Sequence, residues 1–486
     1  MANSASTLLR SAPTADGTTS FLLTSSETES QEKPPDALPR SRTSTAKLRR
    51  DWKRLYASMQ PYLVGRLGGA MGTHSARVSG AWAFLLGMVS WVICMFRQVP
   101  CQFPPAGTAP DRFGWMCYTD ITALYYSRGQ VTGGIPYIDV AWEYPVLTGY
   151  FARIANVIAG WLGADLSADI EGSQMALNAN IYFAVTAVGL FLCIMWLISS
   201  QLQIAPANPG LAMAVAISPT IWATGLINWD ALVIALTAAG LASWIKGKPG
   251  WAGLWWGLGV AAKLYPIVII GALAVLCLRK PAFRTKLTRQ YFFMLATAII
   301  TWSVANLPVM ITQFDGWKLF YTMNYSDRGA DLGSLWYALS LMGLGVPDPT
   351  TLSRAVMIMG YIGLAFLILM ARKTPTVIQI AYLAVAIMMV GNLVYSPQYV
   401  LWLLPLIVLA RPKVLDVFVF TCAELFYFVF IWLQLRGNDL TLGISDAPWV
   451  YILSILVRIG ATIWIMSRVV RDVVTAQPDE PLLTRD

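Results

Sequence analysis

Long apolar runs separated by short polar loops make up most of this chain between about residues 79 and 468. The runs are continuous over about 20 residues and lack the period-two alternation of transmembrane strands, so they predict membrane-spanning helices and disfavour a β-barrel. The runs at 250–262 and 265–278 are too short to cross about 30 Å of hydrocarbon alone. We expect an all-α polytopic membrane protein with about 11 to 13 transmembrane helices. The runs are 79–97, 177–199, 211–227, 231–245, 250–262, 265–278, 291–311, 353–371, 376–395, 398–411, 414–435 and 448–468.

The loops between these runs differ in charge on alternate sides of the predicted membrane. One set lacks Asp and Glu and contains Lys246, Lys248, Arg279, Lys280, Arg284, Lys286, Arg289, Arg372, Lys373, Arg411 and Lys413. The other set contains Asp111, Asp120, Asp139, Glu143, Asp165, Asp169, Glu171, Asp230, Asp315, Asp327, Asp331, Asp348, Asp439 and Asp446. Because Lys and Arg are enriched in cytoplasmic loops, we expect the basic loops and both termini to be cytoplasmic. The acidic loops, and with them the chemistry, are then expected on the external or periplasmic face of the plasma membrane.

Composition excludes an ordinary soluble protein and argues against a nucleic-acid partner. Of 486 residues, 56% are hydrophobic and only 13% are charged, which is typical of a multi-pass membrane protein. Much of the formal charge of +9 comes from residues 40–66 and from the short basic loops. Contact with anionic lipid explains this excess better than nucleic-acid binding does.

The chain divides into a long membrane region with polar ends. Residues 1–45 are rich in Ser, Thr and Pro and are expected to form a disordered cytoplasmic tail, followed by a basic juxtamembrane segment at 46–78. The membrane domain is placed at 79–470 and a second cytoplasmic tail at 471–486. Within the domain, 98–176 is expected to be a large external catalytic loop with amphipathic helices on the membrane surface, although a further span within it is an alternative.

Cysteine and histidine usage limits the chemistry. Cys101 and Cys117 share the first external loop and can form a disulfide if that compartment is oxidising. The only histidine, His74, precedes the first span, so catalysis by histidine and a cysteine-histidine metal site are both excluded.

Asp120 is the leading catalytic candidate. It follows Tyr118 and Thr119 and begins a helix-like run, and Glu143 and Tyr144 come about 20 residues later. A carboxylate among aromatic side chains at a membrane surface is partly desolvated, which raises its pKa and makes it a better base. The alternative is that Asp120 is only a helix N-cap.

Further polar groups recur at predicted external ends of helices. Lys263, on a short external turn before Pro266, suits the phosphate of a lipid, or it extends only to the headgroups. Arg328 either binds phosphate or pairs with Asp327 and Asp331. The remaining candidates for substrate binding are Tyr118, Glu143, Tyr144, Asn228, Asp230, Asp327, Gln398 and Tyr399. Two ionisable residues, Glu424 and Arg458, lie inside the last two runs, and we interpret them as a structural bridge.

In the residues it places on one face, the chain resembles the polytopic glycosyltransferases of the C-type superfamily. The residues that carry the likeness are Asp120, Tyr144 with Pro145, Asn228, Lys263 with Pro266, and the run Ser396-Pro397-Gln398-Tyr399. The likeness covers roughly residues 79 to 468 and is greatest to family 87, the polyprenyl-phosphate-sugar-dependent enzymes that include actinobacterial α-mannosyltransferases. The chain has Tyr-Pro-Val at 144–146 where many relatives have Tyr-Pro-Pro.

The resemblance implies inverting transfer of a single sugar, with mannose favoured over arabinose, from a polyprenyl-phosphate donor to an envelope glycolipid or glycan. Asp120 would be the general base, with Asp111 as the alternative, and Lys263 and Arg328 would stabilise the donor phosphate. The external loops contain no Asp-X-Asp, so neither a metal nor a cofactor is expected.

Two other functions remain open from the sequence. A transporter or lipid-linked sugar flippase has a similar number of spans, but commonly shows internal repeats and polar groups at mid-membrane, whereas here the polar groups gather at one surface. A ligase that moves a preassembled glycan would use the same surface and differ mainly in donor size.

Overall fold

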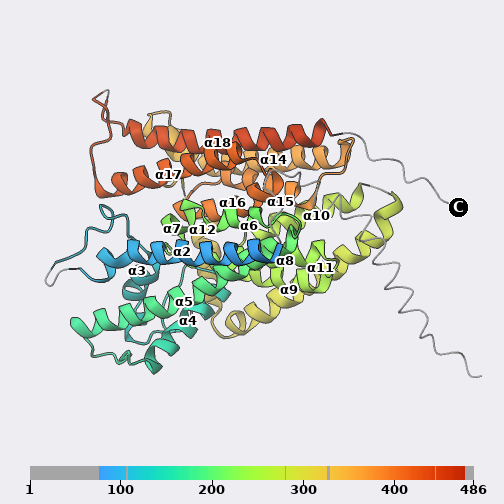
Figure 1. Cartoon of the computed structure of the whole chain (residues 1–486). Coiled ribbons are helices and arrows are strands. Elements are labelled where there is room, and N and C mark those ends of the chain that lie inside the picture. The colour runs from blue at the N-terminus through green and yellow to red at the C-terminus, as the bar shows by residue number, and fades with distance from the viewer. Residues whose placement is uncertain (1–75, 105–107, 280, 326–328, 444, 477–486) are drawn as a thin grey trace, which may run out of the picture. The chain divides into compact units, whose positions relative to one another are not determined.

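The structure, a computed structural model, describes residues 76–104, 108–279, 281–325, 329–443 and 445–476. It is helical, with one isolated bridge between Pro136 and Val140 and no strand among the described residues (Figure 1). The all-α prediction is confirmed. The tail predicted at 1–45, and most of 46–78 and 471–486, lie outside the described residues.

The helices before residue 230 are α2 (Ala76–Gln102), α3 (Asp120–Ser127), the 3-10 helix η1 (Gln130–Thr132), α4 (Val146–Trp161), α5 (Ser173–Ile204), α6 (Gly210–Ala216) and α7 (Pro219–Thr224). The next group is α8 (Asp230–Ile245), α9 (Pro249–Ala262), α10 (Pro266–Leu278), α11 (Pro281–Thr312), α12 (Phe314–Tyr325) and α13 (Leu335–Leu341). The last group is α14 (Pro349–Met370), α15 (Val377–Gly391), the 3-10 helix η2 (Pro397–Tyr399), α16 (Val400–Ala410), α17 (Val414–Arg436) and α18 (Trp449–Val474).

Every apolar run of the sequence corresponds to helix, but proline breaks one of them. The run 211–227 forms two helices, α6 and α7, because Pro219 lacks an N–H and disfavours helical backbone at Ser218. The run 398–411 opens with η2 at Pro397 before α16 begins.

Six of the described helices are long and apolar enough to cross a membrane. Their outer faces expose large apolar side chains, such as Phe96, Ile300 and Phe366, to the surroundings. The shorter apolar helices are different: α8, α15 and α16 are almost wholly buried within the protein. A helix covered by other helices does not have to match the hydrocarbon thickness, which explains how short runs serve inside the domain. The six spans are Gly80–Gln102, Ser173–Ile204, Lys286–Thr312, Pro349–Met370, Val414–Arg436 and Trp449–Val474.

A pair of glycines lets helices α9 and α11 pack closely. Gly253 and Gly257 lie one turn apart on α9, and a Cβ at either position would collide with the backbone of α11, at Met294 and Ala298 respectively. Small residues at this spacing let two helix backbones approach and pack by van der Waals contact. The α9–α11 pair therefore holds the helix that ends at Lys263.

The segment 98–176 contains the end of α2, then α3, η1 and α4. A disulfide joins Cys101 at the end of α2 to Cys117 just before α3. Helix α4 packs on α5, α9 and α11, and is not among the six spans. The polar interruption at Asn156 is buried, where it accepts a hydrogen bond from the Tyr125 hydroxyl at 3.0 Å and donates one to the Gln130 carbonyl at 2.9 Å.

Candidate active site

Asp120 is the first residue of α3, but it does not cap the helix. The N-cap is Thr119, whose hydroxyl accepts a hydrogen bond from the Ile121 N–H at 3.2 Å. The Asp120 carboxylate is thus available for other contacts, and it accepts a hydrogen bond from the Tyr144 hydroxyl at 2.7 Å. Its own N–H donates to the Ile227 carbonyl at 2.7 Å, which joins the start of α3 to the segment before α8.

Asn228 extends this arrangement. Its side-chain amide donates to the Tyr144 hydroxyl at 3.2 Å, and its side-chain oxygen accepts from the Asp230 N–H at 2.9 Å. Asn228 therefore orients the hydroxyl that in turn orients Asp120. Asn228 and Asp230 are both buried, so they act on the site through the residues that they contact.

Lys263 lies beside this group, at the end of α9. Its ammonium nitrogen is 2.9 Å from Asp230 Oδ1, and the Trp402 indole N–H donates to Asp230 Oδ2 at 3.0 Å. The ammonium also lies over the rings of Tyr144, at 4.8 Å, and Tyr399, at 5.5 Å. The π faces and the carboxylate together stabilise a cation that is only slightly exposed.

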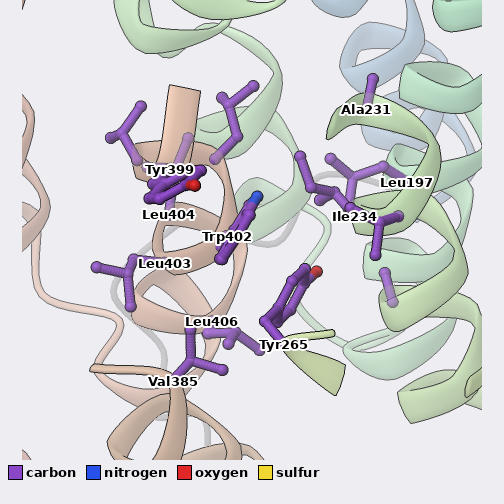
Figure 2. Packing of buried hydrophobic residues seen from close by; sticks show 14 of the residues in the cluster. Leu197, Ala231, Ile234, Tyr265, Val385, Tyr399, Trp402, Leu403, Leu404 and Leu406 are labelled. Atoms are coloured by element: carbon purple, nitrogen blue, oxygen red, sulfur yellow. The ribbon is translucent and has the colours of Figure 1, made fainter. Parts of the chain in front are cut away.

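Stacked aromatic rings form the base of the site. Trp402 stacks on Tyr399 with ring centroids 4.2 Å apart and on Tyr265 with centroids 4.4 Å apart (Figure 2). Tyr399 ends η2 and Trp402 follows three residues later in the first turn of α16, so about one turn presents both rings. This stack runs from the cavity to the buried Asp230.

These elements enclose a cavity of about 580 Å³, within the size range of small-molecule sites. Asp120 and Lys263 both contribute to its wall. The lining residues are Asp120, Leu124, Glu143, Tyr144, Lys263, Phe320, Met323, Ser396, Gln398 and Tyr399.

Burial raises the pKa of the Asp120 carboxyl, while hydrogen bonds from Tyr144 and Tyr118 and the charge of Lys263 act in the opposite direction. Burial also raises the pKa of Tyr144 well above its usual value, with the charge of Asp120 adding to the effect. Tyr144 therefore stays a hydrogen-bond donor, and Asp120 is a stronger base than an exposed aspartate when it is ionised.

Glu143 and Gln398 supply polar groups on other parts of the wall. Glu143 forms an ion pair with Arg128, at the end of α3. Gln398 is buried, and within the described part of the chain its side-chain oxygen accepts no hydrogen bond. Both residues are suited to the hydroxyl groups of a sugar.

Three acidic or basic candidates do not join the described site. Asp111 is exposed, pairs with Arg436 at 2.7 Å and accepts a hydrogen bond from the Gly114 N–H. Asp327 and Arg328 lie outside the described residues. Of the two candidate bases, Asp120 lines the cavity and Asp111 does not.

Sequence reasoning missed several side chains of the site. Trp402 is in the apolar run 398–411, and Phe320 and Met323 are in the loop after the run 291–311, where nothing marked them as site residues. The spacing of Tyr399 and Trp402 was the one available signal. Arg128 follows the short run Ile121–Ser127, and its pairing with Glu143 depends on a turn that the sequence does not reveal.

The fold and this site together define a class, an all-helical membrane protein with a cavity lined by a carboxylate and a lysine. Residues 173–397 match the model of Glycosyltransferase family 87. The chain is a membrane glycosyltransferase similar to this family, as the sequence predicted. The matched region includes Asn228, Asp230 and Lys263, but not Asp120, Tyr144 or Tyr399.

Comparison with other known proteins adds little. No curated protein matches the chain. Among solved structures, the chain is similar to "ArnT from Cupriavidus metallidurans bound to Undecaprenyl phosphate", with 13% identity over 80% of this chain and 78% of that one. The TM-score of 0.42 is too low to establish a common fold.

Proposed function

We propose that this chain is an inverting glycosyltransferase that moves a single sugar, with mannose favoured over arabinose, from a polyprenyl-phosphate donor to a glycolipid or glycan acceptor. The observation that carries the proposal is that Asp120, oriented by Tyr144, and the cation Lys263 line one cavity of about 580 Å³. The donor class rests on the likeness to family 87.

In the proposed reaction, the acceptor oxygen attacks the anomeric carbon from the side opposite the phosphate. The new bond joins that oxygen to the anomeric carbon, the bond from this carbon to the phosphate oxygen breaks, and its electron pair leaves with polyprenyl phosphate. Asp120 takes the proton of the acceptor hydroxyl, and Lys263 stabilises the leaving phosphate. Asp230 and Trp402 hold Lys263 in position.

The ends of three helices also support an external site. Helices α8, α9 and α16 each have one end at the cavity region, at Asp230, Lys263 and Tyr399, and the other end in a basic loop, at Lys246, Lys248 and Arg411. Since basic loops favour the cytoplasm, the cavity is proposed to open on the other side. Both termini are then cytoplasmic.

A reconstitution experiment tests this function. Purified protein in detergent is incubated with polyprenyl-phosphate mannose or polyprenyl-phosphate arabinose and an envelope lipid extract, while polyprenyl phosphate release and glycolipid mass are followed. We expect acceptor-dependent release with the wild type, with the mannose donor preferred, and none with a folded Asp120→Asn variant. Turnover by Asp120→Asn equal to wild type would remove Asp120 as the base, and no turnover with either donor would contradict the proposed donors.

A further inference from the structure

Tyr395 is the last residue before the run Ser396–Tyr399, which contributes three residues to the cavity wall. Its side chain is fully buried and is not part of the cavity lining. Three of its polar groups have partners: its N–H donates to the Leu332 carbonyl at 2.9 Å, its carbonyl accepts from the Tyr427 hydroxyl at 2.6 Å, and its hydroxyl donates to both carboxylate oxygens of Glu424, at 2.9 and 3.0 Å. Tyr395, next to the cavity wall, is thus held by hydrogen bonds to three different residues.

Arg458 completes this arrangement from α18. The expected bridge between Glu424 and Arg458 is not a direct ion pair: the guanidinium carbon of Arg458 lies 3.5 Å from the ring centroid of Tyr395, and Glu424 binds that ring's hydroxyl. The tyrosine therefore stands between the two charges. Arg458 also donates to the Gly333 carbonyl at 2.9 Å, and the Gly333 N–H donates to the Tyr451 hydroxyl at 3.0 Å.

Two non-helical segments, 331–334 and 392–396, meet at these charges. They exchange two backbone hydrogen bonds, from the Asp331 N–H to the Leu393 carbonyl at 2.8 Å and from the Tyr395 N–H to the Leu332 carbonyl. Gly333 adopts φ of +73°, and a Cβ there would collide with the Tyr427 hydroxyl and the Tyr395 carbonyl. Glycine is therefore required at position 333 for this packing.

Arg458 and Glu424 both lie far from the nearer ends of their helices, which argues against an incidental contact with Tyr395. Arg458 lies nine residues into α18, about 13 Å from its start, and Glu424 lies twelve residues from the end of α17, about 18 Å. Non-helical backbone at such depth persists only where protein satisfies its polar groups. A buried arginine and a buried glutamate are costly residues for that task, because each loses its hydration, so a role beyond filling space is expected.

From this geometry we infer that Arg458 and Glu424 are positioning residues of the glycosyltransferase: acting through Tyr395, they fix Ser396, Gln398 and Tyr399 on the cavity wall. The ammonium of Lys263 lies over the ring of Tyr399, so the placement of Tyr399 affects the cation that is proposed to face the donor phosphate. The inference rests on the proposed function for its kinetic consequence, but not for its structural one. Because neither residue lines the cavity, we expect their loss to raise the donor KM more than it lowers kcat.

The test uses Arg458→Lys, which keeps the charge and removes the planar guanidinium that stacks on Tyr395 and reaches Gly333. Arg468→Lys is the matched control, because it makes the same change on the same helix at a residue whose guanidinium carbon lies 5.3 Å from the ring centroid of Trp464. Hydrogen exchange is measured on peptides covering 329–336 and 392–400, and KM and kcat are measured with the lipid-linked donor. We expect about tenfold faster exchange in both peptides and a donor KM about five to ten times higher for Arg458→Lys, with kcat changed less and Arg468→Lys unchanged.

Other results separate the possible failures. Wild-type exchange and donor KM in a folded Arg458→Lys protein, or a fall in kcat alone, would overturn the inference. Should Arg458→Lys not fold, Tyr395→Phe is used instead, because it removes only the hydroxyl that binds Glu424. Wild-type exchange in both peptides and a wild-type donor KM in this variant would likewise overturn the inference. If the wild type shows no turnover with any donor, the proposed function fails, whereas the exchange data still confirm or refute the positioning role.

Discussion

Replacing Tyr144 with phenylalanine removes one hydroxyl from the site and keeps the ring. The hydroxyl donates to Asp120 at 2.7 Å and accepts from Asn228 at 3.2 Å. The ring contacts are retained, because phenylalanine still packs against Trp229 and still lies under the ammonium of Lys263. The variant therefore removes the hydrogen bond to the proposed base, together with the one accepted from Asn228, and keeps the ring contacts.

The expected magnitude follows from the charge of the acceptor. A hydrogen bond to a charged group contributes about 1.5–3 kcal/mol, and about 1.4 kcal/mol corresponds to one pKa unit. Because the bond from Tyr144 favours ionised Asp120, its loss raises the pKa of Asp120 by about one to two units, in addition to the rise that burial already causes. A base with a higher pKa is protonated over a wider pH range. As the pH falls, activity is therefore lost earlier, at a higher pH than in the wild type.

The measurement is the pH dependence of kcat/KM between about pH 5 and pH 9, since that profile reports the essential groups of the free enzyme. We expect the acid limb of Tyr144→Phe to move to higher pH by about one unit or more. Tyr126→Phe is the control, because Tyr126 is on the same helix as Asp120 but its hydroxyl donates to the Met175 carbonyl. An unchanged acid limb in Tyr144→Phe, or an equal displacement in Tyr126→Phe, would refute the reasoning.

Three further predictions concern charge, packing and covalent structure. Lys263→Gln leaves the buried Asp230 without its counter-charge, so we expect a donor KM raised by about tenfold or more and a lower Tm. Kinetics and thermal unfolding measure these two effects. An unchanged donor KM would contradict the phosphate role. Gly257→Val places a branched side chain against the backbone of α11, and we expect destabilisation of about 2 kcal/mol or more in a thermal scan, whereas Gly271→Val, with open space at its Cβ, should change little. Reduction of the Cys101–Cys117 disulfide releases a constraint next to α3 that is worth about 3 kcal/mol, so thiol reductant should lower Tm, and a Cys101→Ser variant should be insensitive to it.

The helices were predictable because long apolar runs need no knowledge of tertiary contacts. The break at Pro219 was also available in principle, since proline disfavours helix at the residue before it. The sequence did not show which helices lie inside. The run that forms α16 is as apolar as the membrane-facing runs, but it is buried among other helices, and only its short length distinguishes it.

The candidate site was partly predictable for a different reason. Asp120, Tyr144 and Lys263 are polar or aromatic residues at helix ends, and such residues stand out between apolar runs. Their partners are far apart in the sequence: Trp402 is 172 residues from the Asp230 that it holds. No local pattern encodes such a pairing, because it depends on which helix ends the fold brings together. The choice between base and N-cap for Asp120 also needed the structure, which shows Thr119 in the capping position.

Charge conservation in the proposed reaction links Asp120 and Lys263. A donor with one phosphodiester charge becomes a phosphate monoester that gains a second charge, while Asp120 loses its charge by taking a proton. The total charge of the site therefore stays constant, and one negative charge moves from the base to the leaving group. The charge of Lys263 already acts on Asp120, and the same ammonium lines the cavity. Because Lys263 acts on both Asp120 and the leaving phosphate, it stabilises the negative charge before and after that charge moves. A partly desolvated site therefore need not take up or release a counter-ion during the chemical step.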